Sequence, residues 1–147
     1  MVCDNSRISE IKIRRADEAE ASVGGFINRE FSGYGERNGL TLNYDEFCFV
    51  AEDVEGIIVG AITGRAYYNE VHIGDLIVAE GVRRSGLGSL LVRTVEESFR
   101  GRGYGAITLS TFGFQAPEFY KKLGYTPEFV RVNEDARLSK FFFKKPL

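Results

Sequence analysis

A glycine-rich turn joins an apolar strand to a helix in the middle of this chain, and it limits both the fold and the ligand. The hexapeptide Arg83-Arg84-Ser85-Gly86-Leu87-Gly88 follows the apolar residues 76–79 and precedes a helical pattern over residues 89–97. A helix that starts at such a turn directs its first N–H groups and the positive end of its dipole to one place. Gly86 and Gly88 allow a ligand to approach the backbone, and the arginines add bidentate donors. The pattern predicts a pyrophosphate-binding loop.

Two other glycine-rich anion-binding motifs fail on the residues that would complete them. A Walker loop ends in Gly-Lys-Ser/Thr, whereas here Gly88 is followed by Ser89 and Leu90. A dinucleotide fingerprint needs a small residue where Leu91 stands and an acidic residue about 20 positions further on, and residues 108–111 contain no acid. The upstream strands are joined by short turns, which fits an antiparallel meander and not a Rossmann half.

The remaining pattern, Arg-x-x-Gly-x-Gly at the end of an antiparallel strand, resembles the acyl-CoA loop of the GNAT family of N-acetyltransferases. Residues 116–125 resemble a later helix of that family, with its Tyr-x-x-x-Gly-aromatic ending. The resemblance covers roughly residues 47–125, and the first forty residues match only in pattern. It implies an acetyltransferase with acetyl-CoA as its acyl donor.

Hydrophobic periodicity predicts the elements around the loop. A half-buried strand is expected over residues 10–15, followed by a helix with Asp17 as its N-cap that ends near Phe31, before a stretch with three glycines. Helices are also expected after Gly88 and from Pro117. The order indicates an α+β fold, a mixed and mostly antiparallel central sheet flanked by helices on both faces, in a single domain over residues 1–147. The other expected strands are residues 47–51, 57–66, 71–79, 106–111, 130–132 and 138–144.

Composition excludes several classes of protein. With 147 residues, 44% of them hydrophobic, the chain has the size of one domain with a single core. The net charge is −2 and there is no basic block, so nucleic acid is not an expected partner. No apolar run approaches the roughly 18 residues of a membrane span, and residues 1–5 begin no signal peptide, so we expect a cytoplasmic protein. Cys3 and Cys48 form no disulfide framework, and Cys48 is expected to be a buried small hydrophobe.

The resemblance implies direct acetyl transfer to a primary amine in a ternary complex. Backbone N–H groups near Ile77 and Val78 are expected to stabilise the charge that develops on the thioester oxygen. Tyr120 stands at the family's motif tyrosine and is expected to protonate the departing thiolate. No metal is expected. The residues expected to hold acetyl-CoA are Ile77, Val78, Arg83, Arg84, Ser85, Gly86, Leu87, Gly88 and Ser89.

A base must remove a proton from the acceptor, because a primary amine with a pKa near 10.4 is mostly protonated at neutral pH. His72 is the single histidine, and it lies where many family members carry a glutamate. Imidazole is a good base near neutral pH, so His72 ranks first, ahead of Asp75, Glu30 and an ordered water. Glu70 shares a face with His72 and is placed to orient the ring, whereas Asp75 faces the other way unless a bulge intervenes.

One position departs from the family pattern. The asparagine that often binds the pantetheine arm is replaced here by Gly113, and Gln115 or the backbone alone is left to make that contact. A second class of function therefore stays open, an acyl-CoA-binding regulatory domain without turnover. The acceptor, a small-molecule or peptide amine, is not identified, and pairing of the late strands into a homodimer is left undecided.

Overall fold

The computed structural model describes residue 8 and residues 10–147, and the chain divides into two compact units, Met1–Thr41 and Leu42–Leu147. In the first unit, residues 11–17 have no regular structure, so the predicted strand over residues 10–15 is wrong. The side chains of Ile11 and Ile13 are 63% and 97% exposed. Apolar alternation makes a strand only where a neighbouring strand pairs with it and buries one face, and these residues have no such pairing.

Helix α2 (Ala21–Arg37) starts later and runs longer than its sequence pattern predicts. Asp17 accepts a hydrogen bond from the Ala19 N–H at 2.9 Å in a turn before the helix, and the N-cap position belongs to Glu20. The helix continues through the glycines that were expected to end it, because each glycine costs a helix only about 1 kcal/mol relative to alanine.

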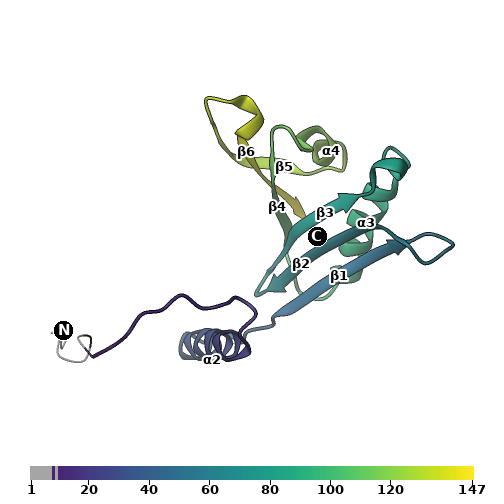
Figure 1. Ribbon diagram of the computed structural model, residues 1–147. Coiled ribbons are helices and arrows are strands. Elements are labelled where there is room, and N and C mark those ends of the chain that lie inside the picture. Colours follow the sequence, from purple (N-terminus) through teal and green to yellow (C-terminus); the bar gives the residue numbers. More distant parts are fainter. Residues whose placement is uncertain (1–7, 9) are drawn as a thin grey trace. The chain divides into compact units, whose positions relative to one another are not determined.

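The second unit is built on a six-stranded sheet (Figure 1) with the order β1-β2-β3-β4-β6-β5. Every neighbouring pair is antiparallel except β3 and β4, which are parallel. The mixed, mostly antiparallel sheet with helices that the sequence predicts is confirmed. The strands are β1 (Asp45–Glu52), β2 (Ile58–Tyr67), β3 (Glu70–Val78), β4 (Ala106–Phe112), β5 (Thr126–Arg131) and β6 (Lys140–Pro146).

The parallel pair β3–β4 is joined at one end only. The two strands pair over three residues, from Glu70 opposite Ala106 to His72 opposite Thr108. Beyond His72 they diverge, as Figure 1 shows. The sheet therefore opens into a wedge beside the far half of β3, where backbone groups have no neighbouring strand to bond.

One face of the sheet carries the hydrophobic core. Helix α3 (Leu87–Phe99) packs there through Leu91, Val92, Val95 and Phe99, all at most 5% exposed. Helix α4 (Pro117–Lys122) lies on the same core through Tyr120, whose ring centroid is 6.1 Å from that of the β6 residue Phe143. Each large apolar side chain buried in this way contributes about 2 kcal/mol.

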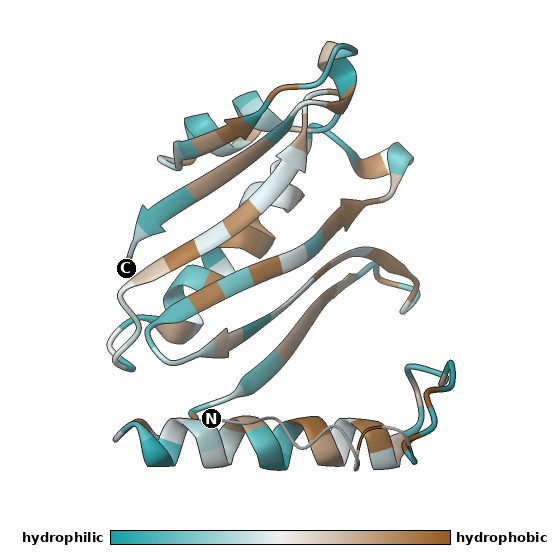
Figure 2. Ribbon diagram, turned by 90° about the vertical axis from the view of Figure 1, so that its left-hand side faces the viewer, coloured by the Kyte–Doolittle hydropathy of each residue, from teal (hydrophilic) through white to brown (hydrophobic). Residues whose placement is uncertain are grey.

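The opposite sheet face carries polar side chains such as Thr63 and Arg65 together with exposed apolar ones such as Ile77, and strand alternation separates it from the core face. In β2 the buried residues are Gly60, Ile62 and Ala66, and the residues between them, such as Thr63 and Arg65, point away from the core. The alternation is visible along the strands in Figure 2. Two short 3-10 helices, η1 (Glu80–Val82) and η2 (Ala136–Leu138), complete the unit. Across residue 8 and residues 10–147, no helix has the length and hydrophobicity that crossing a membrane requires.

Candidate active site

The glycine-rich loop ends in an exposed helix N-terminus. Gly86 takes the N-cap position of α3 with φ of 87°, a left-handed conformation that favours glycine. The first hydrogen bond of the helix runs from the Leu90 N–H to the Gly86 carbonyl at 3.0 Å. The N–H groups of Leu87, Gly88 and Ser89 therefore have no partner within α3. These donors, with the helix dipole, suit an anion such as a pyrophosphate.

Arg83, the first of the two arginines before the helix, is hydrogen-bonded to the end of β3. Arg83 donates from Nε to the Val78 carbonyl at 3.0 Å, and Arg84 has a positive φ of 63°. Ser85 donates from Oγ to the Val82 carbonyl at 2.5 Å, which closes the turn. Because these contacts are short-range, the loop shape follows directly from its own residues.

A cleft of about 930 Å³ runs from this loop along the wedge between β3 and β4 to α4. The volume lies within the range of small-ligand sites. Seven of the nine predicted cofactor residues line it, whereas Ser85 and Leu87 line a separate hollow beside β2. The lining residues are Gly74, Asp75, Leu76, Ile77, Val78, Val82, Arg83, Arg84, Gly86, Gly88, Ser89, Ser110, Thr111, Phe114, Gln115, Ala116, Phe119 and Tyr120.

The residues on the far wall of the cleft, opposite β3, are mostly ones that the sequence pattern does not predict as site residues. Ser110 and Thr111 come from β4, and Phe119 comes from α4, where its ring lies against the Gly88 position, 3.3 Å from a Cβ built there. The resemblance of residues 116–125 to the family's later helix was the signal for α4, but no local pattern marks the β4 residues. They reach the cleft because β4 diverges from β3.

A bulge in β3 sets the direction of the side chains that follow it. Thr63 pairs with Asp75 and Gly64 pairs with Ile73, so Gly74 is an extra residue in β3. Asp75 consequently shares the polar face with His72, and its Oδ2 accepts from Thr63 Oγ1 at 3.3 Å. The sequence pattern alone directs Asp75 to the face opposite His72 unless a bulge intervenes. Gly74 is that bulge, and it turns Asp75 to the same face as His72.

Backbone donors also face the wedge. The Ala79 N–H bonds to the Val59 carbonyl of β2 at 2.8 Å, and successive strand residues point their backbone groups to alternate sides. The Ile77 N–H is therefore directed to β2, and the Leu76 and Val78 N–H groups are directed into the cleft. Of the two residues near which donors are predicted, Val78 directs its N–H into the cleft and Ile77 does not. The Leu76 N–H faces the cleft in place of the Ile77 N–H.

His72 lines a second hollow, of about 530 Å³, on the polar face of the sheet. Its Nδ1 lies 2.9 Å from Thr108 Oγ1. Burial lowers the pKa of His72, and Arg65 and Lys140 lower it further, while Glu70 raises it. Gly74 lines both this hollow and the cleft, so the two hollows adjoin at the bulge.

Tyr120 lies at the cleft wall with its ring in the core. It is 6% exposed, and burial raises its pKa to about 12. The hydroxyl is therefore protonated at neutral pH, the state that a proton donor requires. Structure and sequence pattern thus bring Tyr120 to the cleft and leave His72 in the adjoining hollow, while the alternative base Glu30 belongs to α2 in the first unit.

Cys48 is exposed, so the expectation that it is buried is wrong. It lies in β1 opposite Thr63, on the polar face, and lines the same hollow as His72. The aromatic run around it is misleading, because only Phe47 and Phe49 on either side turn toward the core. Cys3 lies outside the described residues.

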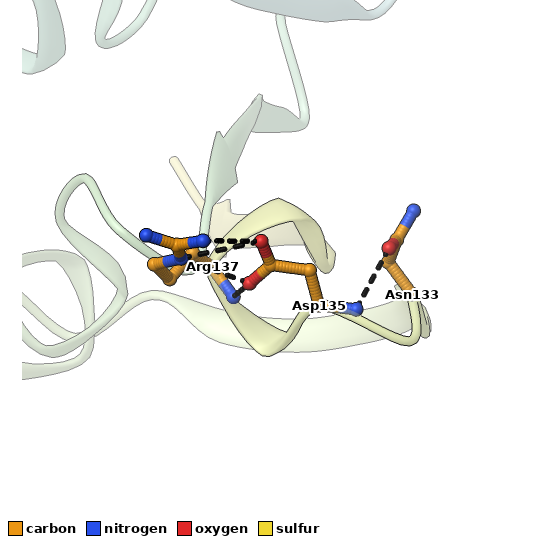
Figure 3. Close-up of polar contacts among 3 residues, drawn as sticks. All are labelled: Asn133, Asp135 and Arg137. Carbon is orange, nitrogen blue, oxygen red and sulfur yellow. Dashed lines mark hydrogen bonds and ion pairs between the residues drawn. The ribbon is translucent and has the colours of Figure 1, made fainter.

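Gly113 is a glycine for a steric reason. A Cβ at this position would lie 2.4 Å from the Ala136 carbonyl oxygen, so an asparagine does not fit here. Ala136 belongs to the turn between β5 and β6, which Arg137 and Asp135 brace by an ion pair of 2.7 Å (Figure 3). Gln115 lines the cleft, but its Oε1 already accepts from the Phe112 N–H at 3.0 Å. Its amide NH₂ is the part that can reach a ligand.

Comparisons with known proteins agree with this geometry. The model of the acetyltransferase (GNAT) family matches residues 14–125. An acetyltransferase of Bacillus cereus has a similar structure, with a TM-score of 0.74 and 34% identity, over 95% of this chain and 99% of that one. An aminoglycoside 6′-N-acetyltransferase complexed with coenzyme A shares the fold, with a TM-score of 0.60 and 21% identity, over 69% and 72% of the two chains.

A blasticidin-S acetyltransferase of Streptomyces morookaense is 36% identical over 72 residues, which are 48% of this chain and 52% of that protein. The match thus spans about half the length of that relative. An uncharacterised N-acetyltransferase of Methanocaldococcus jannaschii is 29% identical over 67% of each chain. Because the family model covers most of the residues, including the loop and α4, this chain belongs to the GNAT family of acetyltransferases.

Proposed function

We propose that this protein is an acetyl-CoA-dependent N-acetyltransferase that modifies a small primary amine. The observation that carries the proposal is that a helix N-terminus, strand N–H groups without a neighbouring strand and the ring of Tyr120 line one continuous cleft. Family membership supports acyl-CoA as the donor, and so does the aminoglycoside 6′-N-acetyltransferase of similar fold that is complexed with coenzyme A.

The donor would be held mainly by backbone groups. The N–H groups at the start of α3 and the guanidinium of Arg84 suit a pyrophosphate, which needs several donors and positive charge. The wedge between β3 and β4 suits an extended pantetheine arm, because strand-like N–H and C=O groups line it. Gln115 offers one amide donor beside that arm.

The chemistry is a transfer of the acetyl group from sulfur to nitrogen. The amine nitrogen bonds to the thioester carbonyl carbon, the carbon–sulfur bond breaks, and the nitrogen loses one proton. His72, directly or through an ordered water, accepts that proton, and Tyr120 supplies a proton to the sulfur. The Leu76 and Val78 N–H groups stabilise the oxygen while it carries negative charge.

The acceptor is proposed to be a small molecule. The hollow beside His72, about 530 Å³, has the size of a small-ligand site, with Glu46 and Arg65 in its lining and Asp75 in the adjoining cleft. Two similar proteins, a blasticidin-S acetyltransferase and an aminoglycoside 6′-N-acetyltransferase, are named for small-molecule acceptors.

The test is an acetylation assay with acetyl-CoA and a panel of polyamines, amino sugars, amine antibiotics and N-terminal peptides. We expect release of free thiol and a mass increase of one acetyl group on at least one small amine. Binding of acetyl-CoA in calorimetry with no thiol release above the buffer rate would instead favour the regulatory domain. Acetylation of peptides alone would overturn the small-molecule acceptor.

A further inference from the structure

The side chains of His72, Thr108 and Glu70, from two strands, form a hydrogen-bond chain that begins at the His72 imidazole. The Thr108 hydroxyl of β4 donates to Glu70 Oε1 of β3, and Thr108 Oγ1 also lies 2.9 Å from His72 Nδ1. His72 is directly opposite Thr108 in the parallel pair, and Glu70 is two residues before it on the same face. The paired backbones therefore hold the chain in place.

The chain has only one consistent direction. A threonine hydroxyl has a single proton, and an ionised carboxylate can only accept. The Thr108 proton is therefore used on Glu70, and the Thr108 oxygen must accept a hydrogen bond from His72. Nδ1 carries that proton, so in the neutral ring Nε2 is left with its lone pair.

We infer that Thr108 and Glu70 are positioning residues that hold His72 in the Nδ1–H tautomer, with Nε2 as the atom that accepts the proton of the acceptor amine. The inference rests on the proposed function, in which His72 takes that proton. When the proton moves from the amine nitrogen to Nε2, the ring becomes an imidazolium, and its Nδ1–H still donates to Thr108. The chain is thus satisfied before and after the transfer.

The charged groups around His72 explain why such a chain is useful. Arg65 of β2 lies directly opposite His72, and Lys140 of β6 is close enough to act on it. Both cations, together with burial, oppose a positive charge on the ring. Glu70 is the group that favours a positive charge on the ring. Thr108 connects the Glu70 carboxylate to Nδ1 of that ring by hydrogen bonds.

Nitrogen NMR tests the tautomer without any assay of activity, because His72 is the single histidine in the chain. The probe is the full-length protein labelled with ¹⁵N-histidine and titrated with acid. Above the pKa of the ring we expect one pyrrole-type signal from Nδ1 and one pyridine-type signal from Nε2. The opposite assignment, with the proton on Nε2, would overturn the inference.

Variants then connect the chain to the reaction. Thr108→Val removes the acceptor for Nδ1–H and should shift the neutral ring toward the Nε2–H form, with kcat/KM lower by at least about 10-fold. Thr108→Ser keeps the hydroxyl and should restore both the tautomer and the rate. Thr94→Val is the control, since Thr94 bonds the Leu90 carbonyl within α3 and should change neither.

The two levels of the hypothesis fail in different ways. If Thr108→Val leaves the tautomer unchanged, the positioning role is wrong whatever the enzyme does. If it changes the tautomer but not kcat/KM or its pH profile, Nε2 is not the proton acceptor. If the wild-type protein acetylates no amine while the NMR signals are as expected, the proposed function fails and the hydrogen-bond chain stands.

Discussion

Gly86 and Gly101 have the same left-handed backbone conformation but lie at different sites, which makes them a matched pair for substitution. Their φ values are 87° and 77°, and a Cβ built at either position meets no atom within 4 Å. Valine at either should therefore cost about 1–2 kcal/mol of stability from the left-handed backbone alone. Of these two glycines, Gly86 lines the cleft and Gly101 does not. We expect Gly86→Val to abolish coenzyme A binding in calorimetry and Gly101→Val to retain it. Equal binding by both variants would contradict a pyrophosphate site at the loop.

Tyr120 and Tyr125 form a second pair, with ring centroids 5.8 Å apart. Tyr120→Phe keeps the buried ring and removes the proposed proton donor, so kcat should fall by about 100-fold with the stability nearly unchanged. The Tyr125 hydroxyl is buried without a hydrogen-bond partner among the described residues. Tyr125→Phe should therefore raise the free energy of unfolding by about 1 kcal/mol and leave kcat unchanged. Urea unfolding and steady-state kinetics measure both effects. An active Tyr120→Phe variant would exclude the acid role.

The pKa of His72 makes stability depend on pH. Because burial lowers that pKa in the folded protein, the unfolded chain binds a proton first as the pH falls below about 6.5. The free energy of unfolding should therefore decrease from pH 6.5 down to the folded pKa and not change further on account of this group. His72→Gln should remove this part of the pH dependence in urea unfolding measured from pH 7.5 to 5. An identical pH dependence in both proteins would show that the ring titrates as it does in water.

At the level of the elements, Lys145 joins three of them. Its Nζ contacts Glu96 of α3 at 2.7 Å and donates to the Leu123 carbonyl after α4 at 2.8 Å, and its own backbone belongs to β6. The Glu96 side chain is 5% exposed, and its other oxygen has no partner among the described residues. The Lys145 ammonium is therefore the group that offsets the cost of burying the Glu96 carboxylate.

Lys145→Met should lower the free energy of unfolding by roughly 3 kcal/mol, because it leaves Glu96 buried and unpaired. The double variant with Glu96→Leu should recover most of that loss, since no charge then remains to be desolvated. Lys121→Met is the control, because its pair with Glu118 is exposed and should contribute less than about 1 kcal/mol. A double variant as unstable as Lys145→Met would show that packing, and not charge, links these elements.

For the molecule as a whole, ligand binding should appear as added stability. Coenzyme A at 100 times its Kd should add about 2.7 kcal/mol to the free energy of unfolding. For a chain of this length that corresponds to a rise in Tm of about 5–10 °C. NAD at the same concentration should leave Tm unchanged, because the loop lacks the acidic residue of a dinucleotide site. A shift with NAD and none with coenzyme A would reverse the assignment of the loop.

The parts of this protein that could be predicted from the chain are those that depend on neighbours in sequence. The loop from Arg83 to Gly88 and the helix after it follow from local spacing, and so do five of the six strands of the second unit, whereas β5 begins four residues before the strand predicted over residues 130–132. Tyr120 is identified through the family resemblance of residues 116–125. Single-domain organisation over residues 1–147 stays a prediction. The strand predicted over residues 10–15 is wrong, because alternation of apolar and charged residues does not say whether a partner strand exists.

The rest depends on contacts between distant residues, and no local pattern reports those. The direction of Asp75 changes with one extra residue, Gly74, that is visible only in the pairing with β2. Gly113 is glycine because a carbonyl 23 residues later occupies the space, as the positions of Gly113 and Ala136 show. Thr108, which carries no motif, reaches His72 only through the parallel pairing of β3 and β4. Local motifs thus identify the chemistry, and strand register selects which side chains take part in it, because register is a property of the folded sheet.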